Sequence, residues 1–311
     1  MGKLAVVFPG QGSQRVGMLE DVLGESIVAD TFEEASGVLG YDLRALVVSG
    51  PEEQLNQTEF TQPALLTASI ALWRLAREKG LPSPDAFAGH SLGEYAALVA
   101  AGVLAFGDGV SLVQQRGQFM QTAVPVGQGG MAAILGLEDA VVTAICNECS
   151  TAEAVVQAAN FNAPGQVVIA GQMDVLNQAI EACKEAGAKR AMALAVSAPF
   201  HSRLMLPAAE KMATALDKVT LKPPESPIVQ NVHADYETDP EIIKANLVKQ
   251  MSEAVLWTGS IQRLYQDGVT RVIECGPGNV LAGLNKRINR DIESMSLNSL
   301  SGIEKTLAQL G

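Results

Sequence analysis

Short apolar runs that end at glycine-containing turns recur along the chain. Leu4–Phe8 runs into Pro-Gly, Ala86–Ala88 into glycine, and Val272–Glu274 into Cys-Gly-Pro-Gly. Compact apolar runs of this kind are typical of parallel strands buried on both faces. Thr61–Lys79, with a proline near its start and a glycine after its end, is a predicted helix, as is the alanine-rich Leu92–Ala101. This alternation of strands and helices predicts an α/β fold in which helices cover a parallel sheet.

The middle of the chain follows a different order of elements. The predicted strand, helix, strand, strand, helix and strand cover Met131–Leu137, Glu138–Cys149, Ala154–Asn160, Gln166–Gly171, Met173–Ala186 and Arg190–Val196. This order is that of a ferredoxin-like unit. Because parallel-sheet patterns flank it on both sides, we expect a small subdomain over residues 127–196, inserted between residues 1–126 and 197–311 of a larger domain. A cleft between two such domains is the default place for a binding site.

The composition narrows the class of protein. With 48% hydrophobic and 18% charged residues, the sequence is that of a globular protein. A formal net charge of -12 argues against a nucleic-acid partner, which would require a surplus of Lys and Arg. The longest near-apolar stretch, Ala96–Phe106, is far below the roughly 18 residues of a membrane helix, and Leu4–Phe8 is too short for a secretion signal. Four cysteines fit free thiols in a reducing compartment. We therefore expect a cytoplasmic protein without membrane attachment.

Gly89-His90-Ser91-Leu92-Gly93 fits the pattern G-x-S-x-G, after a short predicted strand and before a helix. This context is that of a nucleophile elbow. Glycines flank the serine because the turn is strained and neighbouring backbone passes close by, and the N–H groups of the helix start face a developing oxyanion. The alternative is a tight turn without chemistry. The position between strand and helix favours catalysis by Ser91.

A serine nucleophile needs a base, and the chain has three histidines. His90 adjoins Ser91, and adjacent side chains diverge in an elbow. His233 lies at a predicted strand end with no obvious companion. His201 lies where the chain returns from the predicted subdomain toward the cleft, so we predict that it is the base. No acidic residue stands out as a third member; an amide or a backbone carbonyl would also orient the imidazole, and Gln250 is the candidate.

Two patterns resemble cofactor motifs. Gly10–Arg15 follows a predicted strand, but Arg15 stands in place of the third glycine of G-x-G-x-x-G, which argues against dinucleotide binding. Cys146 and Cys149 form a C-x-x-C inside a predicted helix, with no second pair or histidine nearby, which argues against a zinc or redox site. We expect neither a metal nor a cofactor.

Seven blocks, in this order, resemble bacterial malonyl-CoA:acyl carrier protein transacylases over essentially the whole chain. They are residues 8–14 (FPGQGSQ), 61–64 (TQPA), 89–94 (GHSLGE), 116–121 (RGQFMQ), 160–165 (NFNAPG), 199–201 (PFH) and 274–278 (ECGPG). The resemblance implies an α/β-hydrolase-like core with an inserted ferredoxin-like subdomain, in agreement with the pattern above. One departure is Glu253-Ala254, where members of the family often carry Asn-Pro.

The resemblance also implies catalytic roles. Ser91 would be the nucleophile and His201 its base. The backbone carbonyl of Gln250 would hold the imidazole, and the backbone N–H groups of Gln11 and Leu92 would form the oxyanion hole.

Arg116 is implied to bind the free carboxylate of a malonyl group, since a planar guanidinium matches a carboxylate bidentately. An acetyl group would leave that buried charge unpaired. The alternative is an arginine on a polar helix face. Phe200 is implied to exclude an α-methyl branch, with core packing as its alternative. The remaining implied substrate contacts and pocket-lining residues are Gln62, His90, Met120 and Asn160.

The implied reaction is a ping-pong transfer of malonyl from malonyl-CoA to Ser91 and on to the phosphopantetheine thiol of acyl carrier protein, for fatty acid synthesis by a monomer. Carrier proteins of this kind are acidic, so docking is expected through Lys189 with Arg190, or through Lys286, Arg287 and Arg290. The alternatives are an acyltransferase of a polyketide or polyunsaturated-lipid pathway, a serine esterase or thioesterase, and a non-catalytic scaffold that binds the carrier.

Overall fold

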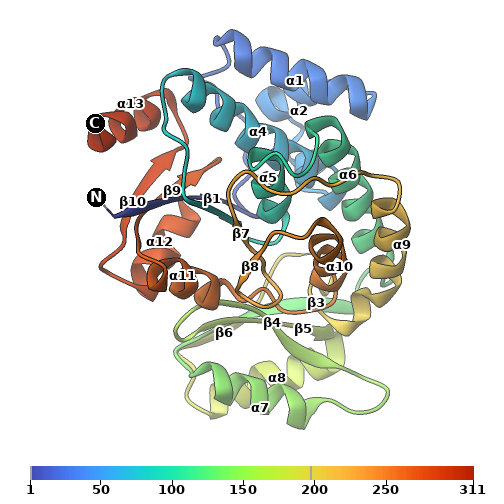
Figure 1. Ribbon diagram of the computed structural model, residues 1–311. Helices are drawn as coiled ribbons and strands as arrows, with labels where there is room; N and C mark the ends of the chain where they lie inside the picture. Colours follow the sequence, from blue (N-terminus) through green and yellow to red (C-terminus); the bar gives the residue numbers. More distant parts are fainter. Residues whose placement is uncertain (1, 197) are drawn as a thin grey trace.

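The computed structural model describes residues 2–196 and 198–311, and a largely parallel sheet runs through its larger part (Figure 1). Among these residues the sheet has six strands in the order β10-β9-β1-β2-β7-β8. They are β1 (Lys3–Phe8), β2 (Ala86–Gly89), β7 (Ile228–Val229), β8 (Tyr236–Glu237), β9 (Val269–Cys275) and β10 (Glu293–Leu297). Every neighbouring pair is parallel except β7 with β8. The three apolar runs of the sequence thus form β9, β1 and β2, which are adjacent at the centre of the sheet.

Helices connect these strands and cover both faces of the sheet. They are α1 (Ser26–Leu39), α2 (Leu43–Ser49), α3 (Glu52–Leu55), α4 (Thr58–Glu78), α5 (Leu92–Ala100), α6 (Phe106–Thr122), α9 (Leu206–Leu216), α10 (Pro240–Gln250), α11 (Trp257–Gln266), α12 (Val280–Ile288) and α13 (Leu300–Leu310), with a 3-10 turn at Arg203–Met205. Among the described residues, no helix is both long and apolar enough to cross a membrane.

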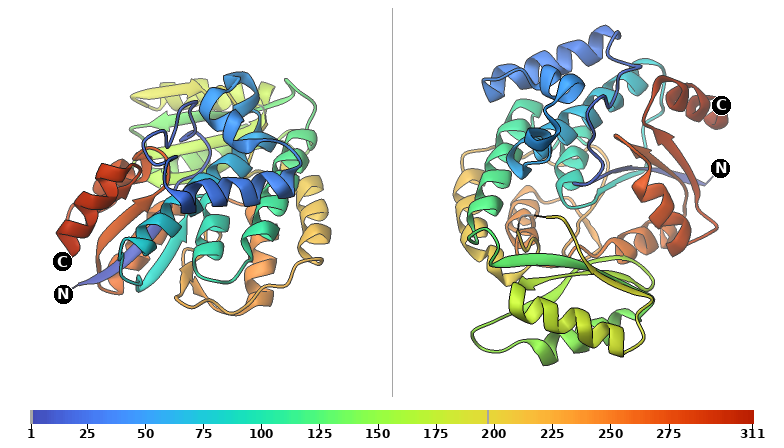
Figure 2. Two further views of the ribbon diagram at one scale, coloured as in Figure 1. Left: turned by 90° about the horizontal axis from the view of Figure 1, so that it is seen from above. Right: turned by 180° about the vertical axis from the view of Figure 1, so that it is seen from behind.

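Strand β1 shows how the sheet separates two cores. Leu4, Val6 and Phe8 face the core that contains α1, α4, α5 and α6, whereas Ala5 and Val7 face the core that contains α11 and α12. All five side chains are buried, because successive side chains of a strand point to opposite faces and both faces are covered. Figure 2 shows the two helical layers from above and from behind.

The middle of the chain forms the second, antiparallel sheet that the sequence predicts. Within the described residues it has four strands in the order β4-β5-β3-β6. They are β3 (Gly129–Leu135), β4 (Val156–Ala163), β5 (Gln166–Gln172) and β6 (Arg190–Ala193), and α7 (Asp139–Cys149) and α8 (Met173–Glu185) pack against them. These two helices lie on the face turned away from the main body (Figure 1). The ferredoxin-like order of elements is confirmed, while the expected limits 127–196 remain a prediction.

Some predicted element ends differ from the structure. The last strand of the small sheet ends at Ala193, not Val196, because the chain turns: the Val196 N–H donates to the Leu194 carbonyl, and both side chains line a cavity. Strand β7 ends at Val229, so His233 does not lie at a strand end. The backbone folds back there, with the Ala234 N–H donating to the Gln230 carbonyl at 3.0 Å.

Two glycines allow three backbone segments to meet behind the turn at Ser91. A Cβ at Gly89 would overlap the backbone of Gly93, and a Cβ at Gly93 would overlap the carbonyl of Phe8 at the end of β1. Because backbone atoms cannot rotate away as a side chain can, a residue without Cβ is required at both positions. The close approach fixes the start of α5 against the ends of β1 and β2.

Gly93→Ala is expected to lower the free energy of unfolding by about 1–3 kcal/mol, because its methyl group would overlap the Phe8 and Pro9 carbonyls. Urea unfolding measures this change. Gly37→Ala is the matched control: the site is exposed on α1 with open space around the added Cβ, and the change should raise the free energy of unfolding by about 0.5–1 kcal/mol. Equal effects of the two substitutions would contradict the close approach.

Candidate active site

Ser91 lies in the sharp turn between β2 and α5. Its φ of 52° and ψ of -108° put it among the few non-glycine residues with positive φ, a conformation that persists only when its surroundings hold it. Its backbone N–H donates to Asn231 Oδ1 at 2.7 Å, and Asn231 Nδ2 donates to the Gly89 carbonyl at 2.6 Å. One asparagine therefore holds both arms of the turn, and the turn presents the Ser91 hydroxyl at the start of a helix.

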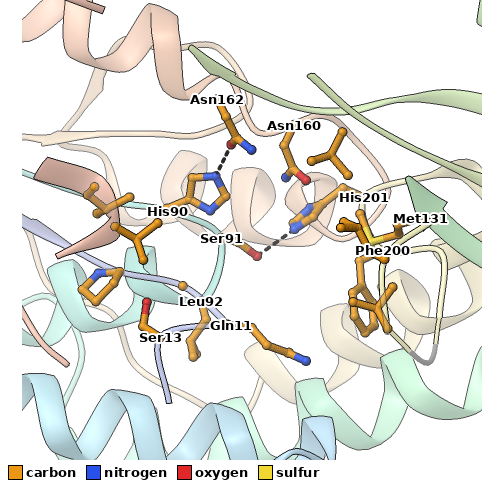
Figure 3. A pocket seen from close by; sticks show the side chains of 18 of the residues that line it. Gln11, Ser13, His90, Ser91, Leu92, Met131, Asn160, Asn162, Phe200 and His201 are labelled. Atoms are coloured by element: carbon orange, nitrogen blue, oxygen red, sulfur yellow. Dashed lines mark hydrogen bonds between the residues drawn. The ribbon is translucent and has the colours of Figure 1, made fainter. Parts of the chain in front are cut away.

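His201 is in hydrogen-bond contact with Ser91, although the two residues are 110 positions apart. Its Nε2 lies 2.7 Å from Ser91 Oγ, and its Nδ1 lies 2.7 Å from the backbone carbonyl oxygen of Gln250 (Figure 3). A carbonyl only accepts, so Nδ1 carries the proton and Nε2 is left to accept from the serine hydroxyl. His201 also has a positive φ, 58°. The arrangement has the geometry expected of a nucleophile, a base and an orienting acceptor.

The imidazole of His201 is held in its neutral form. Burial, and next the positive charge of Arg116, lower the pKa of His201 to about 3. The side chain is 3% exposed. A base that is neutral across the physiological range is ready to take a proton from Ser91.

Arg116 brings a buried positive charge to the nucleophile. It lies on α6, is 1% exposed, and donates from Nη2 to Ser91 Oγ at 3.1 Å. Its other acceptors are the side-chain oxygens of Gln62, at 2.9 Å from Nη1, and of Gln250, at 2.8 Å from Nη2. Among the described residues Arg116 forms no direct salt bridge. A buried guanidinium held only by neutral acceptors is suited to bind an anionic group beside Ser91.

A cavity of about 270 Å³ opens above Ser91, between the main body and β4 and β5. The predicted site residues that line it are Gln11, Gln62, His90, Ser91, Leu92, Arg116, Met120, Asn160, Phe200 and His201. Gln250 lies behind the cavity wall, at the end of α10. Figure 3 shows His201 pointing toward Ser91, with Phe200 and Met131 to one side and Gln11 and Leu92 below the serine. All the predicted site residues are thus brought to one place.

The backbone N–H groups of Gln11 and Leu92 remain available at the cavity. Neither donates to an acceptor within residues 2–196 and 198–311. Leu92 is the first residue of α5, and the first N–H groups of a helix have no partner within it. Such groups suit the stabilisation of a negative charge on oxygen.

The other two histidines point elsewhere. His90 Nε2 is 2.8 Å from Asn162 Oδ1, and burial lowers the pKa of His90 (Figure 3). His233 has a companion after all, since its Nε2 lies 3.0 Å from Asn246 Nδ2. Neither is placed to accept the Ser91 proton.

Comparison with known proteins identifies the family. The model described as "Acyl transferase domain" matches residues 5–305. The malonyl CoA-acyl carrier protein transacylase of Escherichia coli strain K12 is 51% identical over 308 residues, 99% of either chain. The protein of the same name from Salmonella typhimurium is 51% identical over 310 residues, 99% of this chain and 100% of the relative. The chain belongs to the family of malonyl CoA-acyl carrier protein transacylases.

Solved structures of similar proteins share the fold of this transacylase-family chain. An acyl carrier protein S-malonyltransferase from Vibrio cholerae aligns with a TM-score of 0.96 and 50% identity, over 98% of this chain and 99% of that one. A malonyl-transacylase in complex with its type II PKS acyl-carrier protein aligns with a TM-score of 0.97 and 48% identity, over 99% of both chains. The α/β core with a second, antiparallel sheet is therefore confirmed as the family fold.

Two polar residues that the structure places at the site, Asn162 and Glu94, had no role predicted from the sequence. Asn162 belongs to a block of the transacylase family, yet only its contact with His90 indicates a function. Glu94 ends the block that contains Ser91, and it accepts from the Asn231 backbone N–H at 3.1 Å. The signal for Glu94 was its position, one helical turn after the nucleophile and facing the core.

Because burial and then the Arg116 charge lower the pKa of His201 to about 3, its imidazole is expected to stay neutral from pH 8 to pH 5. NMR of protein labelled with ¹³C-histidine, with His201→Asn to assign the signal, measures this titration. Arg116→Gln should raise the pKa of His201, because a neighbouring positive charge disfavours the imidazolium. A wild-type signal that titrates near pH 6, or no rise in the Arg116→Gln variant, would contradict this electrostatic account.

Proposed function

We propose that this chain transfers malonyl from malonyl-CoA to the phosphopantetheine thiol of an acyl carrier protein through a malonyl-Ser91 intermediate. The observation that carries the proposal is a serine with its base at 2.7 Å and a buried guanidinium at 3.1 Å from the same hydroxyl oxygen. The names of the transacylase relatives support the same acyl group, donor and acceptor.

In the first half-reaction, His201 Nε2 takes the hydroxyl proton and Ser91 Oγ attacks the thioester carbon of malonyl-CoA. The N–H groups of Gln11 and Leu92 stabilise the oxyanion, and the Gln250 carbonyl stabilises the imidazolium through Nδ1–H. As the intermediate collapses, the carbon–sulfur bond breaks and His201 returns the proton to the CoA sulfur. In the second half-reaction the carrier thiol gives its proton to His201, and its sulfur attacks the malonyl ester. Ser91 Oγ then leaves and regains the proton.

Arg116 selects a diacid. The free carboxylate of the malonyl group would accept from the guanidinium in place of the neutral Ser91 hydroxyl, and a charged acceptor gives shorter and stronger hydrogen bonds. An acetyl group cannot make this exchange. Phe200, 8% exposed and adjacent to His201, lines the cavity and is proposed to exclude an α-methyl branch.

The remaining cavity residues would shape and contact the acyl chain. Gln62 accepts from Arg116 through Oε1, and its Nε2 lies 3.7 Å from Met120 Sδ. These two side chains form the cavity wall beside Arg116, the clamp that would bind the free carboxylate. His90 and Asn160 also line the cavity. They are proposed to contact the substrate.

Helix α12 is the proposed docking site for the acidic carrier. Val280 and Leu281, at its start, line the cavity, and Lys286 and Arg287 are exposed near its end. Arg287 donates to the side chain of the cavity residue Gln166 at 2.6 Å, so the basic end of α12 lies beside the cavity. Exposed Arg290 follows the helix. Exposed Lys189 and Arg190, at the start of β6, are the other candidate pair.

We further propose a cytoplasmic monomer, with a larger catalytic domain of residues 1–126 and 197–311 and a subdomain of residues 127–196. Ser91, His201 and Arg116 all come from one chain, so the site needs no second copy. Fatty acid synthesis is the proposed pathway. A polyketide pathway is the second candidate, favoured by the relative whose carrier is a type II PKS protein. Comparing the rates of malonyl transfer to the two kinds of carrier distinguishes them.

Arg116→Ala is expected to slow malonyl loading of Ser91 by about a hundredfold or more, since it removes buried charged hydrogen bonds to the substrate carboxylate. Loading of acetyl should be tolerated. Mass spectrometry of the protein mixed with malonyl-CoA or acetyl-CoA alone measures both rates. Ser91→Ala should give no adduct, and Arg271→Ala, which changes a partly exposed arginine on β9, should load as the wild type does. An unchanged preference for malonyl in Arg116→Ala would refute carboxylate binding by Arg116. Rapid hydrolysis of the adduct would indicate a thioesterase.

The double substitution Lys286→Glu and Arg287→Glu should slow transfer from malonyl-Ser91 to the carrier about tenfold or more and spare loading from malonyl-CoA, because steering of an acidic partner depends on local positive charge. Separate assays of the two half-reactions measure this. Lys305→Glu, which changes an exposed lysine on α13, is the matched control. Equal slowing of both half-reactions would refute docking at α12.

A further inference from the structure

The side chain of Gln250 connects the backbone of Ser91 to the guanidinium of Arg116. Its Nε2 donates to the Ser91 carbonyl at 3.0 Å and to Glu94 Oε2 at 2.8 Å, and its Oε1 accepts from Arg116 Nη2 at 2.8 Å. The backbone carbonyl of the same residue accepts from His201. Gln250 is fully buried, so these contacts are sheltered from competition by bulk water.

Only one orientation of this amide satisfies its neighbours. A guanidinium has donors only and a backbone carbonyl only accepts, and Glu94 Oε2 accepts from the Asn231 backbone N–H. If the amide were turned over, its NH₂ would face the Arg116 donors and its oxygen would face the Glu94 carboxylate and the Ser91 carbonyl. The acceptors at Glu94 and at the Ser91 carbonyl therefore together direct an oxygen of Gln250 at Arg116.

Glu94 is well placed to impose this orientation. It lies in the first turn of α5, is 1% exposed, and receives from both Gln250 and the Asn231 backbone through Oε2. Its Oε1 has no hydrogen-bond partner among the described residues. Burying a carboxyl group with one oxygen unpartnered is costly. Glu94 does not line the cavity and is no acceptor of a serine proton, so neither acyl contact nor proton transfer accounts for it.

Arg116 is the charged group that Glu94 acts upon. The two side chains interact electrostatically, and the amide of Gln250 stands between them as a bridge. A direct ion pair would occupy the fork of the guanidinium and compete with a substrate carboxylate. Burial raises the pKa of Glu94 to about 7, so the bridge depends on its acceptor oxygen and not on a full negative charge. The bridged arrangement keeps this carboxyl group close while leaving Arg116 bonded only to neutral oxygens.

We propose that Glu94 is a positioning residue for the clamp: it fixes the Gln250 amide, which holds the Arg116 guanidinium in the orientation that receives the free carboxylate of the acyl group. This inference rests on the proposed malonyl transfer at Ser91. It deepens that function because it assigns part of the acyl-group preference to a residue that does not touch the substrate.

The malonyl-to-acetyl ratio of loading rates tests the role, because a merely structural defect slows both substrates alike. Glu94→Ala removes the acceptor and is expected to lower this ratio roughly tenfold or more, the effect of losing a buried hydrogen bond to a charged group. Glu94→Gln retains an acceptor oxygen for Gln250, and is expected to keep the ratio within about threefold of the wild type. Mass spectrometry with malonyl-CoA and acetyl-CoA gives both rates for each variant.

Two further variants control for folding. Gln250→Met removes the bridging amide while retaining the backbone carbonyl, and should lower the ratio as Glu94→Ala does, even if the latter proves unstable. Thr306→Val changes a buried hydrogen-bonding residue on α13 and should leave the ratio unchanged.

The outcomes separate this inference from the proposed function. An unchanged ratio in Glu94→Ala or in Gln250→Met overturns the positioning role, whatever the overall rates, and so does a Glu94→Gln variant as impaired as Glu94→Ala. In each of these cases the wild type still forms malonyl-Ser91. Absence of that adduct in the wild type would instead overturn the proposed function itself.

Discussion

A buried guanidinium in contact with the serine hydroxyl is the interaction on which the rest of the site depends. Removing a charge from water costs several kcal/mol unless it is well paired. Here Arg116 is bonded to oxygens of Gln62, Gln250 and Ser91, and its guanidinium carbon lies 5.5 Å from the ring centre of Tyr95. These contacts offset part of the cost without neutralising the charge. In the proposed function an incoming carboxylate would offset the remaining desolvation cost, so burial of Arg116 would create both the affinity for a diacid and the penalty for an acyl group without a free carboxylate.

The positive charge of Arg116 and the burial of the site also act on His201. An imidazolium close to Arg116 would be disfavoured twice, by desolvation and by repulsion, and both effects lower the pKa of His201. The base is therefore unprotonated before the reaction, but the imidazolium formed during it needs stabilisation. The Gln250 carbonyl on Nδ1 supplies an acceptor at that moment, and a substrate carboxylate bound to Arg116 would reduce the repulsion. In the proposed function, binding of a carboxylate at Arg116 would therefore favour proton transfer from Ser91 to His201.

The sequence predicts the parts of the site that are local and misses those built from distant contacts. The turn at Ser91 is encoded within five residues between a strand and a helix, so pattern alone identifies it. Arg116 lies on a helix of mixed polarity, where burial leaves no local sign, and only family resemblance indicated its role. Glu94 pairs with Gln250, 156 positions away, and such a pairing has no periodicity that could be seen in one sequence.

The fold class was predicted correctly, but the end of one strand was wrong for a similar reason. The run from Ile228 to Val232 has the composition of a strand, yet pairing stops at Val229. The buried Gln230 and Asn231 that follow are polar residues of the core. The side chain of Asn231 hydrogen-bonds both arms of the turn at Ser91. These contacts outweigh the strand propensity of the segment.

Strand β4 connects the second sheet to the site. The base and its orienting carbonyl lie on segments about 50 positions apart, and β4 contacts both. Gln157 accepts from the Arg203 backbone N–H at 3.0 Å, and its Nε2 lies 3.4 Å from the His201 carbonyl and 3.5 Å from that of Ser252. Two positions further on, the Ala159 carbonyl accepts from the Val255 N–H at 2.9 Å. His201 holds a positive φ that a free loop would not keep. The small sheet thus supplies an edge that holds the His201 segment in place, so it supports the geometry of the site through backbone contacts.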